Sequence, residues 1–149
     1  MKCKPTDKEK KWVKDFIGDV SYLFNVSDYQ ITYNWREEDA ASETGIVLAD
    51  ITVRRDYKTI TINIYQDFWD GSKTERAAAL IHEMCHTITN IQQSVVNELL
   101  DDNLVTRREA VFSNEQETTT IASLIFRLVA YDHTWLQKGM GLRVDKKKK

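Results

Sequence analysis

The chain has 149 residues, of which 42% are apolar and 30% are charged. This length favours one domain that can bury a core without disulfides, and the balance is typical of a globular protein rather than a disordered one. No apolar run approaches the roughly 18 residues of a membrane-spanning helix, and the charged N-terminus lacks the apolar stretch of a secretory signal. We therefore expect a cytoplasmic protein in which Cys3 and Cys85 are free thiols.

Charge is unevenly distributed along the chain. The net charge is −2, but lysines gather at both ends, in residues 1–14 and 146–149. The acidic stretch between them repels nucleic acid and suits a cationic ligand, such as a divalent metal or a basic peptide. We interpret the chain as a single domain over residues 1–149 with short basic termini, and we expect neither a membrane nor a nucleic acid as its partner.

The first half of the chain predicts one helix followed by three strands. Thr6 and Glu9 form a T-x-x-E capping box, which marks the start of a helix, and apolar residues follow at helical spacing. Alternating apolar and polar residues then predict strands over 29–36, 45–54 and 58–65. The short connection between the second and third strands predicts an antiparallel hairpin.

The second half of the chain changes to a helical period. Ser72 and Glu75 form a second capping box, and residues 73–89 follow as the most strongly patterned helix. Two further helices are predicted over roughly 91–104 and from about Ser113 to Gly139. This order of elements predicts an α+β fold with a three-stranded, mostly antiparallel sheet.

An H-E-x-x-H motif, formed by His82, Glu83 and His86, lies inside the helix predicted over 73–89. Histidines four residues apart project from one helix face, so both rings can reach one metal ion. Zinc is bound by such neutral imidazole nitrogens in a tetrahedral shell. Glu83 is rotated by about 100° from His82 and is therefore a candidate general base for a metal-activated water rather than a ligand.

The alternative is that the motif is a coincidence, with two ordinary histidines on a helix. The apolar stripe of this helix runs nearly opposite the midpoint between the two histidines, so they do not belong to the buried face. That arrangement favours a metal site. The stripe consists of Ala77, Leu80, Ile81, Met84 and Ile88.

A catalytic zinc site commonly has three protein ligands and an open position, so a third ligand is expected elsewhere in the chain. His133 is the one remaining histidine, and no ligand type follows His86 directly. Glu115 and Glu117 open the last predicted helix, and only one of them can bind because residues two apart point about 200° apart. The acidic candidates are Asp101, Asp102, Glu109, Glu115 and Glu117.

Together these residues resemble the gluzincin branch of the zincin metallopeptidases, and the short length is similar to minimal zincin-like peptidases often encoded by bacteriophages. In gluzincins the third ligand is a glutamate on a following helix, and residues 115–122 (EQETTTIA) fit that pattern with Glu115 as the ligand. Thr119 stands where such families often have an acidic or amide residue that hydrogen-bonds a ligand histidine. The resemblance covers most of residues 29–130 in element order, although only H-E-x-x-H is a specific motif.

The resemblance implies a zinc-dependent metallopeptidase that acts on a peptide or protein. It further implies that the substrate pairs with an edge strand of the sheet, and the 58–65 strand is the candidate. It also implies a hydrogen-bond donor for the developing oxyanion, which Tyr131 or His133 could supply. Two other functions stay open. The domain could hold zinc and bind a peptide or protein without cleaving it, or it could associate with nucleic acid through its lysine-rich ends.

Overall fold

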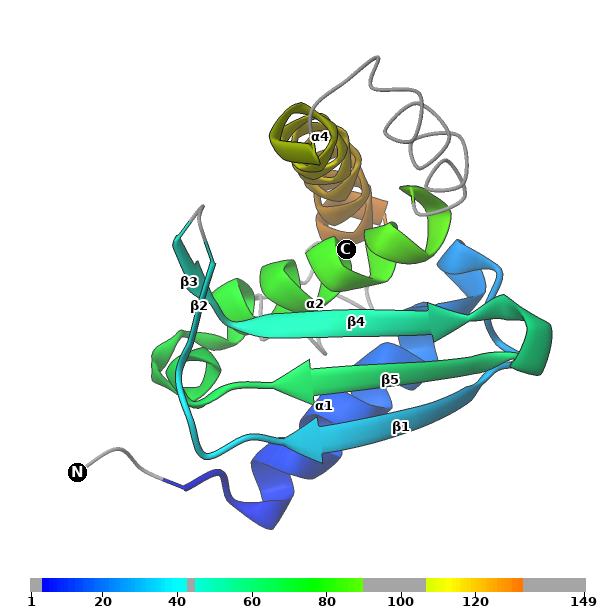
Figure 1. Ribbon diagram of the computed structural model, residues 1–149. Coiled ribbons are helices and arrows are strands. Elements are labelled where there is room, and N and C mark those ends of the chain that lie inside the picture. The colour runs from blue at the N-terminus through cyan, green and yellow to red at the C-terminus, as the bar shows by residue number, and fades with distance from the viewer. Residues whose placement is uncertain (1–3, 43–44, 90–106, 133–149) are drawn as a thin grey trace.

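The computed structural model describes residues 4–42, 45–89 and 107–132, which form an α+β fold (Figure 1). The helix predicted over 91–104 and the extension of the last helix to residue 139 lie outside these residues. The described elements are α1 (Asp7–Val20), η1 (Ser21–Phe24), β1 (Gln30–Trp35), β2 (Ala40–Ser42), β3 (Gly45–Val47), β4 (Ala49–Arg54), η2 (Arg55–Tyr57), β5 (Thr59–Ile64), η3 (Gln66–Asp70), α2 (Lys73–Thr89) and α4 (Arg107–Asp132).

The main sheet has the strand order β1-β5-β4. β4 and β5 pair antiparallel, with Ile51 opposite Ile62, so the predicted hairpin is confirmed. β1 and β5 pair parallel, with Tyr33 opposite Ile62. The sheet is therefore mixed, and the prediction of a mostly antiparallel sheet is wrong.

The position of β5 also corrects a prediction about the edge of the sheet. β5 has a strand partner on each side, so residues 59–64 have no unpaired edge that could accept a peptide. The expectation that a peptide pairs with the 58–65 strand is therefore wrong. β4 is the edge strand beside α2 instead (Figure 1). The predicted strand over 45–54 is interrupted at Leu48, and its first part, β3, pairs with β2 in a separate hairpin.

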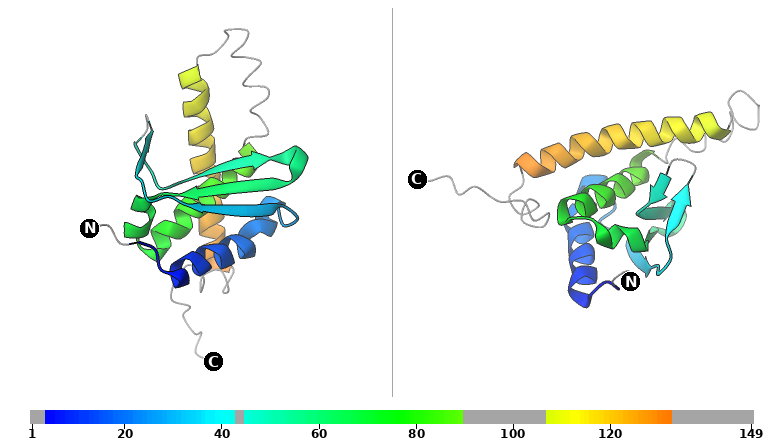
Figure 2. Two further views of the ribbon diagram at one scale, coloured as in Figure 1. Left: turned by 60° about the horizontal axis from the view of Figure 1, so that its bottom comes forward. Right: turned by 90° about the vertical axis from the view of Figure 1, so that its left-hand side faces the viewer.

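The core lies between one face of the main sheet and the helices α1 and α2, which cover that face in both figures (Figures 1 and 2). The inward side chains of β5 are fully buried, because alternate residues of a strand point to the same face. The outward face carries polar residues such as Thr32 and Thr52, which are exposed. The core includes Val13, Phe16, Ile17, Val20, Ile60, Ile62, Ile64, Ala77, Leu80, Ile81 and Met84.

Both predicted capping boxes are present. Thr6 and Glu9 satisfy each other's backbone N–H groups at the start of α1, and Ser72 and Glu75 do the same before α2. The Glu9 carboxylate also accepts a hydrogen bond from Arg76 at 3.0 Å, which ties α1 to α2. Among the described helices, none is long and apolar enough to cross a membrane.

α4 packs across α2, on the side away from α1 (Figure 2). It begins at Arg107 rather than near Ser113, so the predicted start was about two turns late. The side chain of Ala122 is buried against the core, and those of Ile121 and Ile125 pack beside it. This packing places the first half of α4 over the H-E-x-x-H segment of α2.

Candidate metal centre

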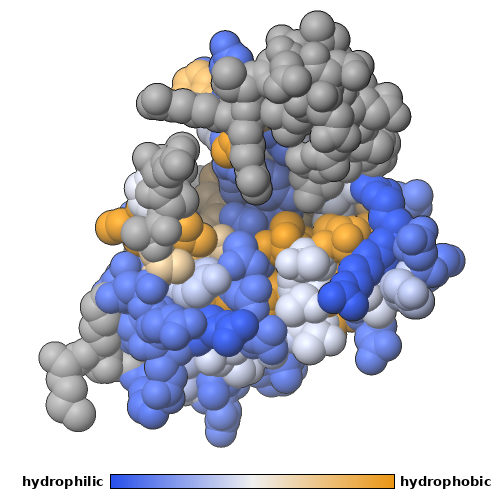
Figure 3. Space-filling view, viewed as in Figure 1, coloured by the Kyte–Doolittle hydropathy of each residue, from blue (hydrophilic) through white to orange (hydrophobic). Residues whose placement is uncertain are grey.

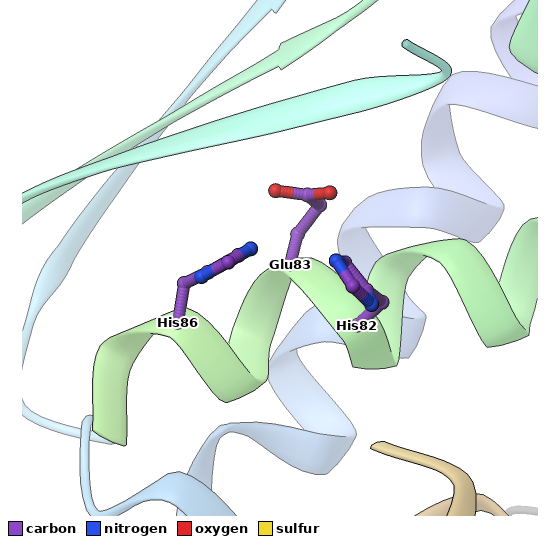
Figure 4. Close-up of side chains that lie close together, drawn as sticks. All are labelled: His82, Glu83 and His86. Atoms are coloured by element: carbon purple, nitrogen blue, oxygen red, sulfur yellow. The ribbon is translucent and has the colours of Figure 1, made fainter. Parts of the chain in front are cut away.

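The H-E-x-x-H segment lies in the second half of α2, as predicted. Figure 4 shows His82, Glu83 and His86 rising from the helix on the side that faces β4. The two imidazole rings are 5.1 Å apart between centroids. One donor atom from each of the three side chains lies within 4.8 Å of the others, so they could share a metal ion.

Glu115 joins this group from α4. Its Oε2 lies 3.3 Å from Nε2 of His82, and its Oε1 lies 3.5 Å from Nε2 of His86. Glu109 and Glu117 are exposed on the same helix. Of the acidic candidates in the described chain, Glu115 is therefore the one whose carboxylate contacts both rings, whereas Asp101, Asp102 and His133 lie outside the described residues.

The two oxygens of the Glu115 carboxylate each lie beside one of the two rings. Ligand atoms at 2.0–2.1 Å from a central ion are separated by about 3.3–3.4 Å along each edge of a tetrahedron. The observed separations of 3.3 and 3.5 Å are of that size, although they involve different oxygens of Glu115, and they are longer than the usual 2.7–3.2 Å of an N–H···O hydrogen bond. Two imidazole nitrogens and a carboxylate are donor types that zinc binds, so the chemistry of His82, His86 and Glu115 fits that ion.

A cleft of about 770 Å³ opens beside these residues. Its base is α2, and its walls come from β3 and β4 on one side and from the first turns of α4 on the other. Figure 3 shows this hollow above the sheet, with hydrophilic surface inside it and hydrophobic surface beside it. The apolar lining includes Ile46, Val47, Leu48, Ala49, Ile51, Ala78, Ala79, Ala110 and Val111.

The charged lining of the cleft is acidic. Four carboxylates line it, and none of its described lining residues is a lysine or an arginine. Such an environment attracts a cation and disfavours further negative charge. The acidic lining residues are Asp50, Glu75, Glu83 and Glu115.

Glu83 is the carboxyl group that this environment affects most. Burial, together with the negative charges of Glu115 and Asp50, raises the pKa of Glu83 to about 8. Burial also lowers the pKa of His86, against the opposing effect of Glu115. A bound cation would favour the ionised form of Glu83 and the neutral form of His86, which are the forms that metal chemistry at this site requires.

Asp50 is a cleft residue that the sequence did not single out. It lies on the edge strand β4, where its carboxylate accepts hydrogen bonds from Asn63 Nδ2 at 2.6 Å and from the Tyr65 hydroxyl at 2.5 Å. Asn34 extends this row to β1 through a 2.9 Å hydrogen bond to Asn63. The alternation of apolar and polar residues in this strand was visible in the sequence. The position of Asp50 beside the cleft was not, because it depends on β4 lying at the edge of the sheet.

Thr119, which stands where the resembled families often have a residue that hydrogen-bonds a ligand histidine, is not the residue beside His86. The side chain of Thr119 is exposed, whereas the preceding residue, Thr118, is fully buried with its Oγ1 at 3.4 Å from Nδ1 of His86. The side chain of Tyr131 and the whole of His133 lie outside the described residues, so their proposed role as oxyanion donors stays a prediction.

No protein-family model matches the chain, and no curated protein or solved structure is significantly similar to it. The resemblance to zincins therefore stays a prediction from the sequence. The function has to be inferred from the geometry and chemistry of the cleft residues themselves.

Proposed function

We propose that the protein is a zinc-dependent metallopeptidase of minimal gluzincin type. His82, His86 and Glu115 would hold the zinc ion, and Glu83 would be the general base. The observation that carries this proposal is the position of the Glu115 carboxylate, 3.3 Å from one ring nitrogen of the H-E-x-x-H motif and 3.5 Å from the other. A third ligand brought to both histidines from another helix is what a catalytic zinc site needs.

Zinc bound at these residues supplies a Lewis acid that polarises a carbonyl group and lowers the pKa of a water molecule. The role of Glu83 follows from its place beside the two rings. Its carboxylate takes one proton from the attacking water, whose oxygen forms a bond to the carbonyl carbon of the peptide. When the C–N bond breaks, Glu83 gives that proton to the leaving nitrogen, so the base returns to its starting form.

Among the described strands β4 is paired on one side only, and this edge supports a peptide as the substrate. Tyr65 N donates to Leu48 O at 3.0 Å, so these two residues, just beyond the β4–β5 ladder, continue its register at a hydrogen-bonded position. Because such pairs alternate, the backbone groups of Ala49 and Ile51 point away from β5. Both residues line the cleft, and an extended peptide could continue the sheet there.

The test compares wild type with Glu83→Gln on a peptide library, with products identified by mass spectrometry. Glu83→Gln should keep its zinc but lose cleavage by 100-fold or more, on the order of what general-base catalysis contributes. Glu117→Gln is the matched control, because Glu117 is exposed on α4, and it should cleave like wild type. Unchanged cleavage by Glu83→Gln would remove Glu83 from its proposed role.

The second candidate function is a zinc-containing module that binds a peptide or protein without cleaving it. The observation that favours it is that none of the described lining residues of the cleft is a tyrosine, lysine or arginine that could stabilise an oxyanion. The same library separates the two functions. Products that share a cleavage preference support the peptidase, whereas intact peptides that bind with measurable affinity support the module.

A further inference from the structure

Thr118 is a buried polar residue at the interface between α4 and α2. Its side chain is fully inaccessible to solvent, and a buried hydroxyl needs hydrogen-bond partners. Three side chains from these two helices surround its Oγ1. Thr89 Oγ1 lies at 3.0 Å, Asn114 Oδ1 at 3.3 Å and His86 Nδ1 at 3.4 Å.

The hydrogen-bonding capacity of this cluster determines which partner donates. A threonine hydroxyl has one hydrogen and two lone pairs, and an amide oxygen can only accept. Thr118 therefore donates its hydrogen to Asn114 Oδ1. Its lone pairs face His86 and the Thr89 hydroxyl, whose one hydrogen also reaches Cys85 O at 3.4 Å. Because the hydrogen of Thr118 is already used, the contact with His86 requires a hydrogen on Nδ1.

The tautomer with a hydrogen on Nδ1 leaves Nε2 of His86 with a free lone pair. This lone pair lies 3.5 Å from Oε1 of Glu115, so two acceptors face each other. A cation between them would turn that repulsion into attraction. In metal sites, the hydrogen bond of one ring nitrogen commonly sets which nitrogen binds the ion.

We propose that Thr118 is a positioning residue, which fixes His86 in the Nδ1–H tautomer and thereby presents Nε2 for metal binding. The consequence for zinc rests on the proposed function, whereas the tautomer itself is a property of the metal-free protein. Thr118 acts through His86 and has no contact with a substrate.

The first test is NMR of the metal-free, ¹⁵N-labelled protein, in which the ring nitrogen shifts of His86 report its tautomer at a pH where the ring is neutral. Wild type and Thr118→Ser should both show the Nδ1–H form. Thr118→Val removes the hydroxyl at nearly constant volume and should shift His86 to a mixture or to the Nε2–H form. An unchanged tautomer in a folded Thr118→Val protein would overturn the proposal, and Thr118→Ala gives the same comparison if the valine variant does not fold.

The second test is zinc affinity, measured by competition with a chromogenic chelator. Thr118→Val should bind zinc about 10–100-fold more weakly than wild type, as is typical when a ligand histidine loses its outer partner. Thr118→Ser should stay within about threefold of wild type, and so should the matched control Thr119→Val, whose side chain is exposed. A serine variant as weak as the valine variant would assign Thr118 a packing role only.

The two tests fail in different ways. If wild type bound no zinc, the proposed function would fall, and the NMR comparison would still decide whether Thr118 sets the tautomer of His86. If wild type bound zinc and all variants bound it equally, the metal site would stand and the positioning role of Thr118 would fall.

Discussion

Oε2 of Glu115 lies 3.3 Å from Nε2 of His82, although the two residues belong to different helices that meet through the packing of α4 on α2. Four apolar residues of α4 pack in or against the core and fix that crossing: Ile121, Ala122, Ile125 and Phe126. The proposed metal centre is therefore assembled by tertiary packing, and the position of its proposed third ligand depends on the rotation of α4 about its own axis.

The position of Glu115 leads to a prediction about two glutamates of α4, Glu115 and Glu117. Glu115→Gln removes the carboxylate that faces both rings and should weaken zinc binding by roughly 100-fold or more, because a neutral amide is a poor zinc ligand. Glu117→Gln removes an exposed carboxylate and should bind zinc like wild type. Competition with a chelator measures both affinities. Equal losses in the two variants, or a loss only in Glu117→Gln, would contradict the ligand assignment.

The raised pKa of Glu83 leads to a prediction about stability in the absence of metal. The folded protein holds this proton up to about pH 8, whereas the unfolded chain releases it near the ordinary value of 4.5. The folded state therefore binds more protons between these pH values, and this residue makes stability fall as the pH rises through that window.

Glu83→Gln lacks this ionisation. In the presence of a chelator, the variant should be more stable than wild type by roughly 1–3 kcal/mol at pH 8, and by much less at pH 5. Urea denaturation at the two pH values measures the difference. A variant that is less stable than wild type at pH 8 would show that burial of the carboxyl group is not costly.

Glu9 has the opposite dependence on pH. Hydrogen bonds from the Thr6 backbone and hydroxyl, together with the Arg76 guanidinium, hold the pKa of Glu9 below its usual value. The stability that this carboxylate contributes is fully present above the pKa that Glu9 has in the unfolded chain. It is lost as the pH falls through the lower pKa that Glu9 has in the folded protein. Glu9→Gln should therefore cost about 1 kcal/mol at pH 7.

Thermal unfolding between pH 3 and pH 7 measures this dependence, with Glu117→Gln as the control on an exposed site. The difference between Glu9→Gln and wild type should shrink as the pH falls below about 4.5, the ordinary value for this group. A difference that stays constant over the whole range would show that the charge of Glu9 does not stabilise the fold.

Asp50 allows a prediction about the polar row on the outer face of the sheet. Asp50→Ala leaves Asn63 Nδ2 and the Tyr65 hydroxyl without the carboxylate that accepts their hydrogen bonds in a half-buried position, which should cost about 1–3 kcal/mol. Thr52→Ala is the matched control, because Thr52 lies on the same strand and face and is exposed. It should cost less than about 1 kcal/mol. Chemical denaturation of both variants checks this, and equal costs would show that the row contributes little.

Local signals in the sequence predicted local structure well. The capping boxes at Thr6 and Ser72 and the apolar spacing after them placed the starts of α1 and α2, because these signals act within a few residues. The short connection at residues 55–57 predicted the β4–β5 hairpin for the same reason. The sequence pattern also named His82, Glu83 and His86, since residues one turn apart share a helix face.

Features that depend on distant contacts were not predictable in this way. The parallel pairing of β1 with β5 requires the chain to cross from one side of the sheet to the other, and no local pattern in residues 30–35 or 59–64 specifies it. The choice between Thr118 and Thr119 depends on the rotation of α4, where one residue corresponds to about 100°. Only the packed structure shows that Thr118 is buried against His86.

The central claim is that the described residues of α2 and α4 together hold one zinc ion. Elemental analysis of the purified protein, after zinc addition and gel filtration, tests this most directly when wild type is compared with His82→Ala. Wild type should carry about one zinc per chain, and His82→Ala should carry almost none, because two remaining ligands bind the ion weakly. A wild-type protein without stoichiometric zinc would contradict the claim.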